Sequence, residues 1–244
     1  MSPRLTLATA RRVANQLRRD PRTVALMVLL PTMLIILFRY VLNSQRAFDA
    51  VIPSLLCIFP FNIMFVVTSV ATLRERTTGT LERLMTLPIG KIDLLAGYAL
   101  AFGLFGVIEV GVATTVCITW LGLSVQGSAA LLVLIAVLDA LLGMALGLFV
   151  SAFARTEFQA VQFMPLFAFP QVLLCGLFEP RDHMIGVLSG LSDIMPLSYA
   201  VDAIKMVTSS TQVSAELVRD MGIVFGCILI ALLAGAATLP RRTP

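Results

Sequence analysis

Residues 22–42 read RTVALMVLLPTMLIILFRYVL, and almost every side chain between the two arginines is apolar. An α-helix rises 1.5 Å per residue, so a run of this length covers about 30 Å, the thickness of the hydrocarbon core of a bilayer. Asp20 and Pro21 precede the run and supply an N-cap and a first-turn proline. The stretch therefore predicts a helix that spans a membrane.

Comparable apolar runs recur along the rest of the chain, at 51–73, 94–121, 129–153, 158–178 and 221–239. The 244 residues are 58% hydrophobic and 13% charged, with a mean hydropathy of +0.94. One soluble core cannot bury that much apolar surface. We therefore predict an all-α polytopic membrane protein with about six spans, forming a single domain over residues 1–244. The prolines inside these runs predict kinks.

The positions of the charged residues predict the orientation. Most of the 18 lysines and arginines flank the runs on the side that faces the cytoplasm if the N-terminus is inside. We expect both termini in the cytoplasm and the chain in a bacterial inner membrane, with no cleavable signal peptide. The net charge of +4 gives no reason to expect a nucleic-acid partner, because the basic residues cluster at the ends of apolar runs.

Residues 4–19 predict an amphipathic helix that lies on the membrane. At 100° per residue, Leu7, Val13 and Leu17 share one side, and the arginines share the other. The four cysteines lie in separate apolar runs without close pairing, so we interpret them as small core residues and expect no metal site.

Two connections are longer than turns, and we expect function to concentrate there. The outer stretch, 179–220, carries short apolar runs broken by glycine and proline, which predict short re-entrant helices in the outer leaflet. Residues 74–88 of the cytoplasmic stretch 74–93 read RERTTGTLERLMTLP and predict a polar helix at the membrane face. Composition alone fits a solvated loop, whose arginines only enforce topology, equally well.

The sequence of 74–88 resembles the first cytoplasmic loop of the membrane subunits of type-2 ATP-binding cassette (ABC) exporters, especially the daunorubicin-resistance-like drug and antibiotic permeases of bacteria. Residues 176–180, GLFEP, and 196–205, PLSYAVDAIK, look like the outer re-entrant segment of that family. The resemblance covers the whole chain. Glu179 and Arg181 depart from it, because an apolar or neutral residue is expected at each.

The resemblance implies that 74–88 is a coupling helix that docks on a separate ATPase. Glu75, Glu82 and the flanking arginines would make charged contacts, Gly79 would permit a tight bend, and Leu84 and Leu87 would anchor the helix. The implied coupling residues are Arg74, Glu75, Arg76, Gly79, Thr80, Glu82, Arg83, Leu84 and Leu87. The implied residues of the outer re-entrant region are Pro180, Pro196, Tyr199 and Asp202.

The chain carries no P-loop motif, no zinc-protease motif and no nucleophile elbow, so we expect no catalytic, cofactor-binding or metal-binding residues of its own. The resemblance implies two copies of an ATPase subunit, which bind ATP and Mg²⁺, and a second membrane subunit, identical or homologous. It also implies contact with membrane lipids and export of a drug, an antibiotic or another amphipathic or lipidic compound.

Two carboxylates, Glu109 and Asp139, fall inside apolar runs, where an unpaired charge costs about 3 kcal/mol or more. Either they line a substrate path or they are hydrogen-bonded between helices. Phe163 and Phe167 suit an apolar pocket, or they are lipid-facing bulk. The competing function is a proton-coupled secondary transporter that uses Glu109 and Asp139; a membrane-embedded enzyme acting on lipid is another.

Overall fold

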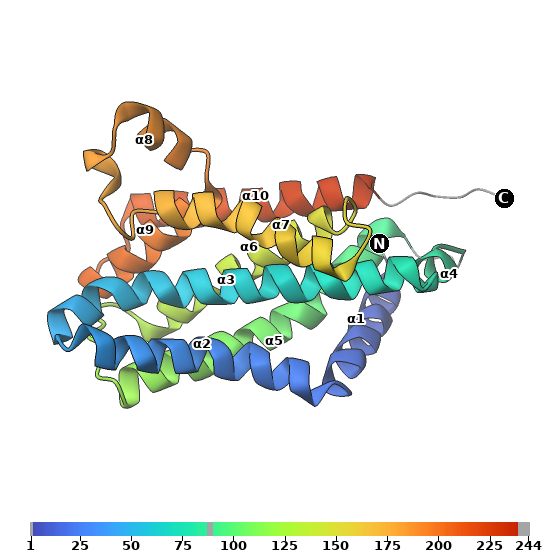
Figure 1. Cartoon of the computed structure of the whole chain (residues 1–244), viewed down its shortest axis with the longest axis horizontal. Helices are drawn as coiled ribbons and strands as arrows, with labels where there is room; N and C mark the ends of the chain where they lie inside the picture. Colours follow the sequence, from blue (N-terminus) through green and yellow to red (C-terminus); the bar gives the residue numbers. More distant parts are fainter. Residues whose placement is uncertain (1, 87–89, 239–244) are drawn as a thin grey trace.

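The computed structural model describes residues 2–86 and 90–238, apart from the side chains of Glu82, Met85 and Asp182. Every regular element within these residues is a helix (Figure 1). The elements are α1 (Pro3–Arg18), α2 (Pro21–Leu42), α3 (Gln45–Thr77), α4 (Thr80–Thr86), α5 (Lys91–Thr119), α6 (Ala129–Val150), α7 (Glu157–Leu174), η1 (Arg181–His183), α8 (Gly186–Ser192), α9 (Pro196–Ser209) and α10 (Ala215–Ala237).

Five of these helices, α2, α3, α5, α6 and α10, are long and apolar enough to cross a membrane. α7 runs beside them along the same axis (Figure 1), although three glutamines and two prolines make it less apolar. By length and composition the described residues therefore hold five candidate spans, or six if the bent pair α8–α9 counts as one, and α7 covers most of the fifth predicted span, 158–178. The chain is therefore an all-helical, multi-pass membrane protein.

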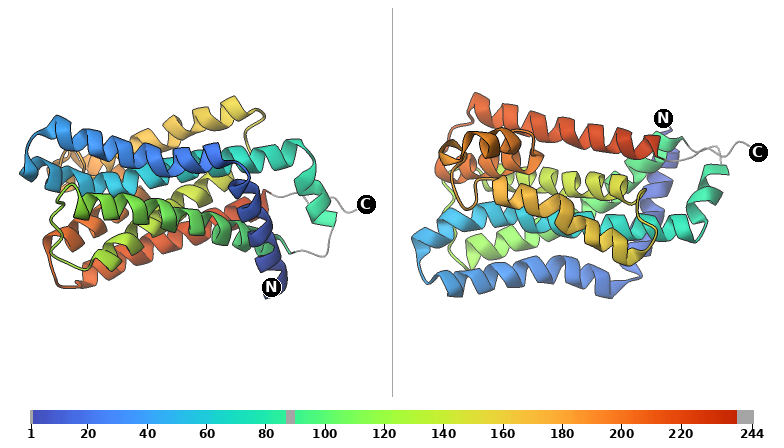
Figure 2. Two further views of the ribbon diagram at one scale, coloured as in Figure 1. Left: turned by 90° about the horizontal axis from the view of Figure 1, so that it is seen from below. Right: turned by 45° about the horizontal axis from the view of Figure 1, so that its top comes forward.

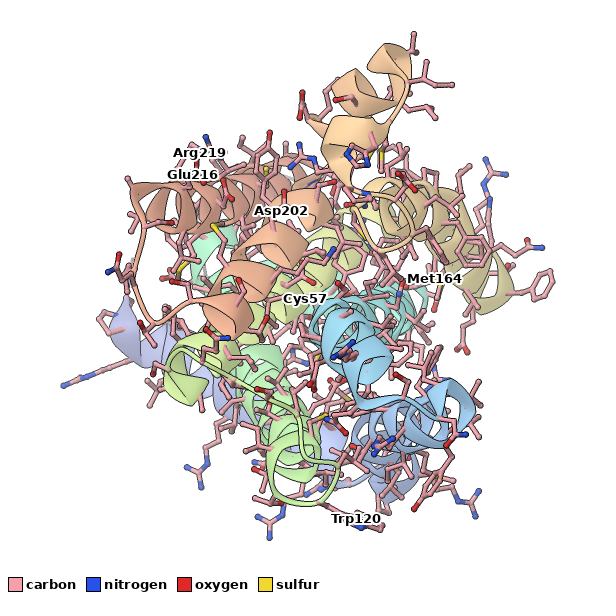
Figure 3. All side chains as sticks on the ribbon, turned by 90° about the vertical axis from the view of Figure 1, so that its left-hand side faces the viewer. Cys57, Trp120, Met164, Asp202, Glu216 and Arg219 are labelled. Carbon is pink, nitrogen blue, oxygen red and sulfur yellow. The ribbon has the colours of Figure 1, made fainter. Side chains whose placement is uncertain are left out.

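α8 and α9 form a bent pair, with 85° between their axes. Both ends of α9 lie at one end of the bundle. Ser198, near its start, contacts the carbonyl of Leu174 at the end of α7, and Val207, near its end, accepts a hydrogen bond from Gly127 in the α5–α6 connection. Figure 3 views this end and shows α8 standing away from the other helices. The pair therefore enters and leaves on one side, as a re-entrant segment does.

Two long helices begin six residues before the predicted span. α3 begins at Gln45 instead of 51, and α10 begins at Ala215 instead of 221. In both helices a serine side chain caps the first turn: Ser44 accepts a hydrogen bond from the amide of Ala47, and Ser214 from that of Leu217. α3 also continues to Thr77, so residues 74–77 form its last turn and are not part of a separate coupling helix. Hydropathy marks only the part of a helix that lies in lipid.

α1 crosses the end of the bundle at a steep angle to the long helices (Figure 2). Its Val13 and Leu17 are buried against residues of α2 and α5, whereas Leu7 is exposed. Thr9 lies so close to Gly97 of α5 that a Cβ on Gly97 would be 2.6 Å from it. Much of the apolar side of α1 is therefore packed against the other helices, mainly α2 and α5.

Close contact between α3 and α6 forms the centre of the fold. A Cβ added at Gly143 would lie 2.1 Å from the carbonyl oxygen of Phe61, and one at Gly147 would lie 2.3 Å from the hydroxyl of Thr68. The two glycines of this Gly-x-x-x-Gly motif therefore let the backbones of α6 and α3 touch. The same motif in α10 faces open space, since no atom of the described residues, apart from the backbone of α10 itself, lies within 4 Å of a Cβ built at Gly222 or Gly226.

This difference predicts opposite outcomes for two chemically identical substitutions. Gly143→Ala should destabilise the protein by about 1–3 kcal/mol, because the added methyl group overlaps the backbone of α3. Gly226→Ala should leave stability unchanged or slightly improved. Thermal unfolding of both variants in detergent, followed by size-exclusion chromatography, measures the difference. Equal melting temperatures for the two variants would show that α3 and α6 are not in contact there.

Candidate functional site

The last turn of α3 and the short helix α4 form a polar projection at the end of the bundle where α1 lies (Figure 1). Gly79 separates the two helices with a φ of +70°, a left-handed conformation that favours glycine. The amide of Thr78 closes α3 by donating to the carbonyl of Arg74. This sharp turn allows α4 to leave the axis of α3 at once.

Glu75 was expected to contact a partner protein, but its side chain lies inside the bundle. Its side chain is 6% exposed and accepts two hydrogen bonds from the guanidinium of Arg12 in α1, at 2.8 and 3.3 Å. The hydroxyl of Tyr98 in α5 also donates to it. The charge of Glu75 is therefore used within the chain, because its position on the last turn of α3 faces α1 and α5.

The neighbouring arginines of this turn also contact other helices. Arg74 donates to both carboxylate oxygens of Glu157 at the start of α7, at 2.6 and 3.0 Å. Arg76 is half-buried and reaches the hydroxyl of Thr238 after α10, at 3.5 Å. The last turn of α3 thus joins α1, α5, α7 and the end of α10.

α4 attaches to the bundle by its leucines. Leu81 is buried in the core, and Leu84 packs against the same core. Leu84 is among the coupling residues that the resemblance implied and Leu81 is not, although their i, i+3 spacing places both on one side of a helix. Arg83 and Thr86 are exposed, and Thr80 is partly exposed. The side chain of Glu82 and the whole of Leu87 lie outside the described part of the chain.

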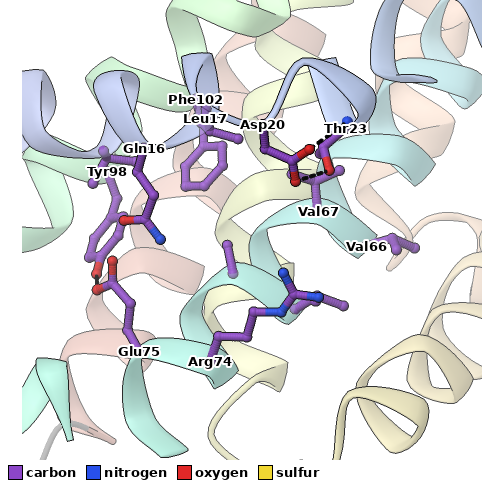
Figure 4. Close-up of a pocket in the computed structure, with 13 residues that line it drawn as sticks. Gln16, Leu17, Asp20, Thr23, Val66, Val67, Arg74, Glu75, Tyr98 and Phe102 are labelled. Carbon is purple, nitrogen blue, oxygen red and sulfur yellow. Dashed lines mark hydrogen bonds between the residues drawn. The ribbon is translucent and has the colours of Figure 1, made fainter. Parts of the chain in front are cut away.

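A groove opens beside this projection, in two sections. The first section, of about 370 Å³, lies between α1, the start of α2, the end of α3 and α5 (Figure 4). The second, of about 480 Å³, continues between α2 and α3 as far as Phe59 and Met164. Thr23, Val66 and Val67 line both sections. Each volume is in the range of pockets that hold small molecules.

The predicted residues of a substrate path do not line this groove. Glu109 and Asp139 are fully buried, on α5 and α6, and their carboxylate oxygens have no hydrogen-bond partner among the described residues. Phe163 is half-buried beside Leu73, and the ring of Phe167 lies 6.4 Å from that of Phe65. The structure therefore leaves the two carboxylates as isolated buried groups.

Arg181 organises the opposite end of the bundle, and it is one of the two residues that depart from the family pattern. Its guanidinium pairs with Asp193, before α9, and with Asp202, on α9, and it lies 5.1 Å from the centre of the ring of Tyr199. Pro196 is the first residue of α9, and Pro180 precedes η1. Arg181 thus joins the connection after α7 to both sides of the bend between α8 and α9.

Comparison with known proteins gives a consistent result. The model of the ABC-2 type transporter family matches residues 4–208. The chain is 27% identical over 172 residues to the probable multidrug ABC transporter permease YbhS of Escherichia coli, covering 70% of this chain and 46% of that protein. It is 24% identical over 184 residues to the linearmycin resistance permease protein LnrN of Bacillus subtilis, covering 73% and 48%.

A third relative is ABC transporter G family member 20 of Dictyostelium discoideum, 25% identical over 162 residues, which are 66% of this chain and 22% of that protein. The chain therefore spans about half the length of the two bacterial relatives, and less of the third.

The Arg12–Glu75 pair generates a prediction about stability. Glu75→Leu alone should lower the melting temperature, because it leaves a half-buried guanidinium beside an apolar side chain. The double variant Arg12→Met with Glu75→Leu should recover much of the loss, since no charge is left unpaired there. Thermal unfolding of both variants in the same detergent tests this. A double variant that melts below the single variant would contradict the assignment of the pair.

Proposed function

The chain belongs to the ABC-2 type transporter family, and on that premise we propose that it is the membrane subunit of an ATP-driven exporter. The observation that carries the proposal is the projection made by the last turn of α3 and α4, which exposes Thr77, Thr78, Arg83 and Thr86 at the end of the bundle where α1 lies. The names of the multidrug and linearmycin-resistance permeases support a drug, an antibiotic or another amphipathic compound as cargo.

We assign α4 as the surface on which a separate ATPase subunit docks. Arg83 and Thr86 are exposed on it, while Leu81 and Leu84 hold it against the bundle. ATP and Mg²⁺ would bind to that partner, and two ATPase copies would serve two membrane subunits. A second membrane chain, identical or homologous, completes the pathway in this proposal. In this proposal the protein lies in a bacterial inner membrane, with α4 and both termini in the cytoplasm.

The arrangement supports a mechanical route from the ATPase to the spans. One turn separates α4 from α3, a continuous helix of 33 residues. A displacement of α4 therefore acts directly on the cytoplasmic end of α3. Glu75 transmits it to α1 and α5, and Arg74 transmits it to α7. The re-entrant pair α8–α9, held by Arg181, forms the exit at the other end.

The two isolated carboxylates favour a second candidate. Glu109 and Asp139 are buried without partners among the described residues, as groups that take up and release protons can be. A proton-coupled carrier would use them and would need no ATPase. The two functions differ in a simple way: only the carrier should continue transport when ATP is absent and a proton gradient is maintained.

Charge reversal at the projection tests the ATPase assignment. Membranes that contain the tagged chain and a candidate cassette ATPase from the same cell are solubilised, and the retained ATPase is measured. Glu82→Arg should reduce retention about tenfold, equivalent to about 1.4 kcal/mol of binding free energy. The matched control is Glu216→Arg, which reverses an exposed charge at the other end of the bundle and should retain the ATPase as wild type does.

The proposal fails if the wild-type chain retains no cassette ATPase, or if Glu82→Arg and Glu216→Arg behave alike. Transport that persists without ATP, and that Glu109→Gln abolishes, would instead establish the proton-coupled carrier.

A further inference from the structure

The groove beside α2 changes from polar to apolar along its length. In the first section, Gln16, Asp20, Arg74 and Glu75 line the wall with Val70 and Phe102 (Figure 4). In the second section the lining residues are apolar except Thr23 and Asn62. Because Val66 and Val67 line both sections, one molecule can occupy the whole groove. Such a gradient matches an amphiphile with its polar end beside α1.

The polar section holds one negative and one positive group that are available to a ligand. The amide and the hydroxyl of Thr23 donate to Asp20, and these hydrogen bonds lower the pKa of the Asp20 carboxyl. Asp20 is therefore ionised at neutral pH. Arg74 uses Nε and Nη2 to bind Glu157, which leaves Nη1 for another acceptor. A headgroup that carries both signs of charge complements this pair.

The length of the groove matches one leaflet of a bilayer. From Arg74 to Phe59, α3 rises about 22 Å at 1.5 Å per residue. Half of a bilayer, with its headgroups, is about 20–22 Å thick. The polar section lies at the level of the amphipathic helix α1, where headgroups are expected. The second section then lies at the depth of the acyl chains.

We propose that this groove binds one phospholipid of the cytoplasmic leaflet, with a phosphoethanolamine headgroup between Asp20 and Arg74 and an acyl chain between α2 and α3. The phosphate contacts Arg74, and the ammonium contacts Asp20. Glu75 and Tyr98 line the same section, so the bound lipid lies against the turn that joins α3 to α1 and α5. Binding at this site requires neither ATP nor a cargo, and its assignment to the cytoplasmic leaflet rests on the orientation proposed above.

Lipid titration of the purified chain, followed by native mass spectrometry, tests the site. The wild-type chain, stripped of lipid in detergent, should bind one phosphatidylethanolamine more tightly than phosphatidylglycerol, which lacks the ammonium. Val67→Phe, at the junction of the two sections, should weaken binding about tenfold. The matched control is Val107→Phe, which makes the same change on a lipid-exposed face of α5 outside the groove and should bind as wild type does.

A second variant, Asp20→Asn, tests the assignment of the headgroup. It keeps a side chain that caps α2, since asparagine is as good an N-cap as aspartate. It removes the negative charge, so phosphatidylethanolamine and phosphatidylglycerol should then bind equally. The melting temperatures of all variants are measured first, so that a loss of binding is compared only between folded proteins.

Three outcomes overturn the proposal: equal binding by Val67→Phe and Val107→Phe, a wild-type chain that does not prefer phosphatidylethanolamine, or an unchanged preference in Asp20→Asn. A fourth outcome would overturn the proposal by identifying a second copy of the chain as the occupant of the groove. Leu30 lines the second section. If Leu30→Cys, in a chain whose Cys227 is replaced by serine, forms a disulfide-linked dimer in membranes, the groove is an interface between copies.

Discussion

The direct contact between the backbones of α3 and α6 is the constraint on which the rest of the structure depends. In lipid, helices gain little from the hydrophobic effect when they associate, so close packing has to hold them together. Gly143 and Gly147 allow that packing, because side chains at these positions would overlap Phe61 and Thr68. α3 is then fixed at the centre, where it also contacts α2, α5, α7 and α9.

A central α3 explains why the polar projection can act on the whole bundle. α3 passes from the re-entrant end to the end that carries α4, and its last turn holds three charged residues that contact other helices. Burying Glu75 is costly unless it is paired, and the pairing fixes α1 and α5 relative to α3. A charge that sequence patterns associate with a partner thus serves to order the chain itself.

The sequence predicted what depends on hydropathy and missed what depends on helix rotation. Apolar runs identified the long helices, and the family resemblance implied a bend at Gly79, where the structure has a φ of +70°. The pattern did not reveal which side of α3 Glu75 faces, since that depends on where α1 and α5 lie. Nor did it distinguish Gly143 from Gly226, which share one motif but differ in whether a neighbouring helix is present.

Uneven packing around α3 also accounts for the groove. In α2, 22% of the most apolar stretch is buried, against 61% in α3, so α2 lies at the edge of the bundle. Near its outer end, the ring of Phe38 lies 6.4 Å from that of Phe59, and at its other end Met27 packs into the core shared with α1. Ile35, between these two contacts, is also buried, so one side of α2 packs on the bundle while Leu26, Leu30 and Leu34 line the groove. If the groove were empty, the apolar side chains that line it on α2 and α3 would lose van der Waals contacts. An acyl chain in the groove supplies those contacts on the side of α2 that packs on no other helix.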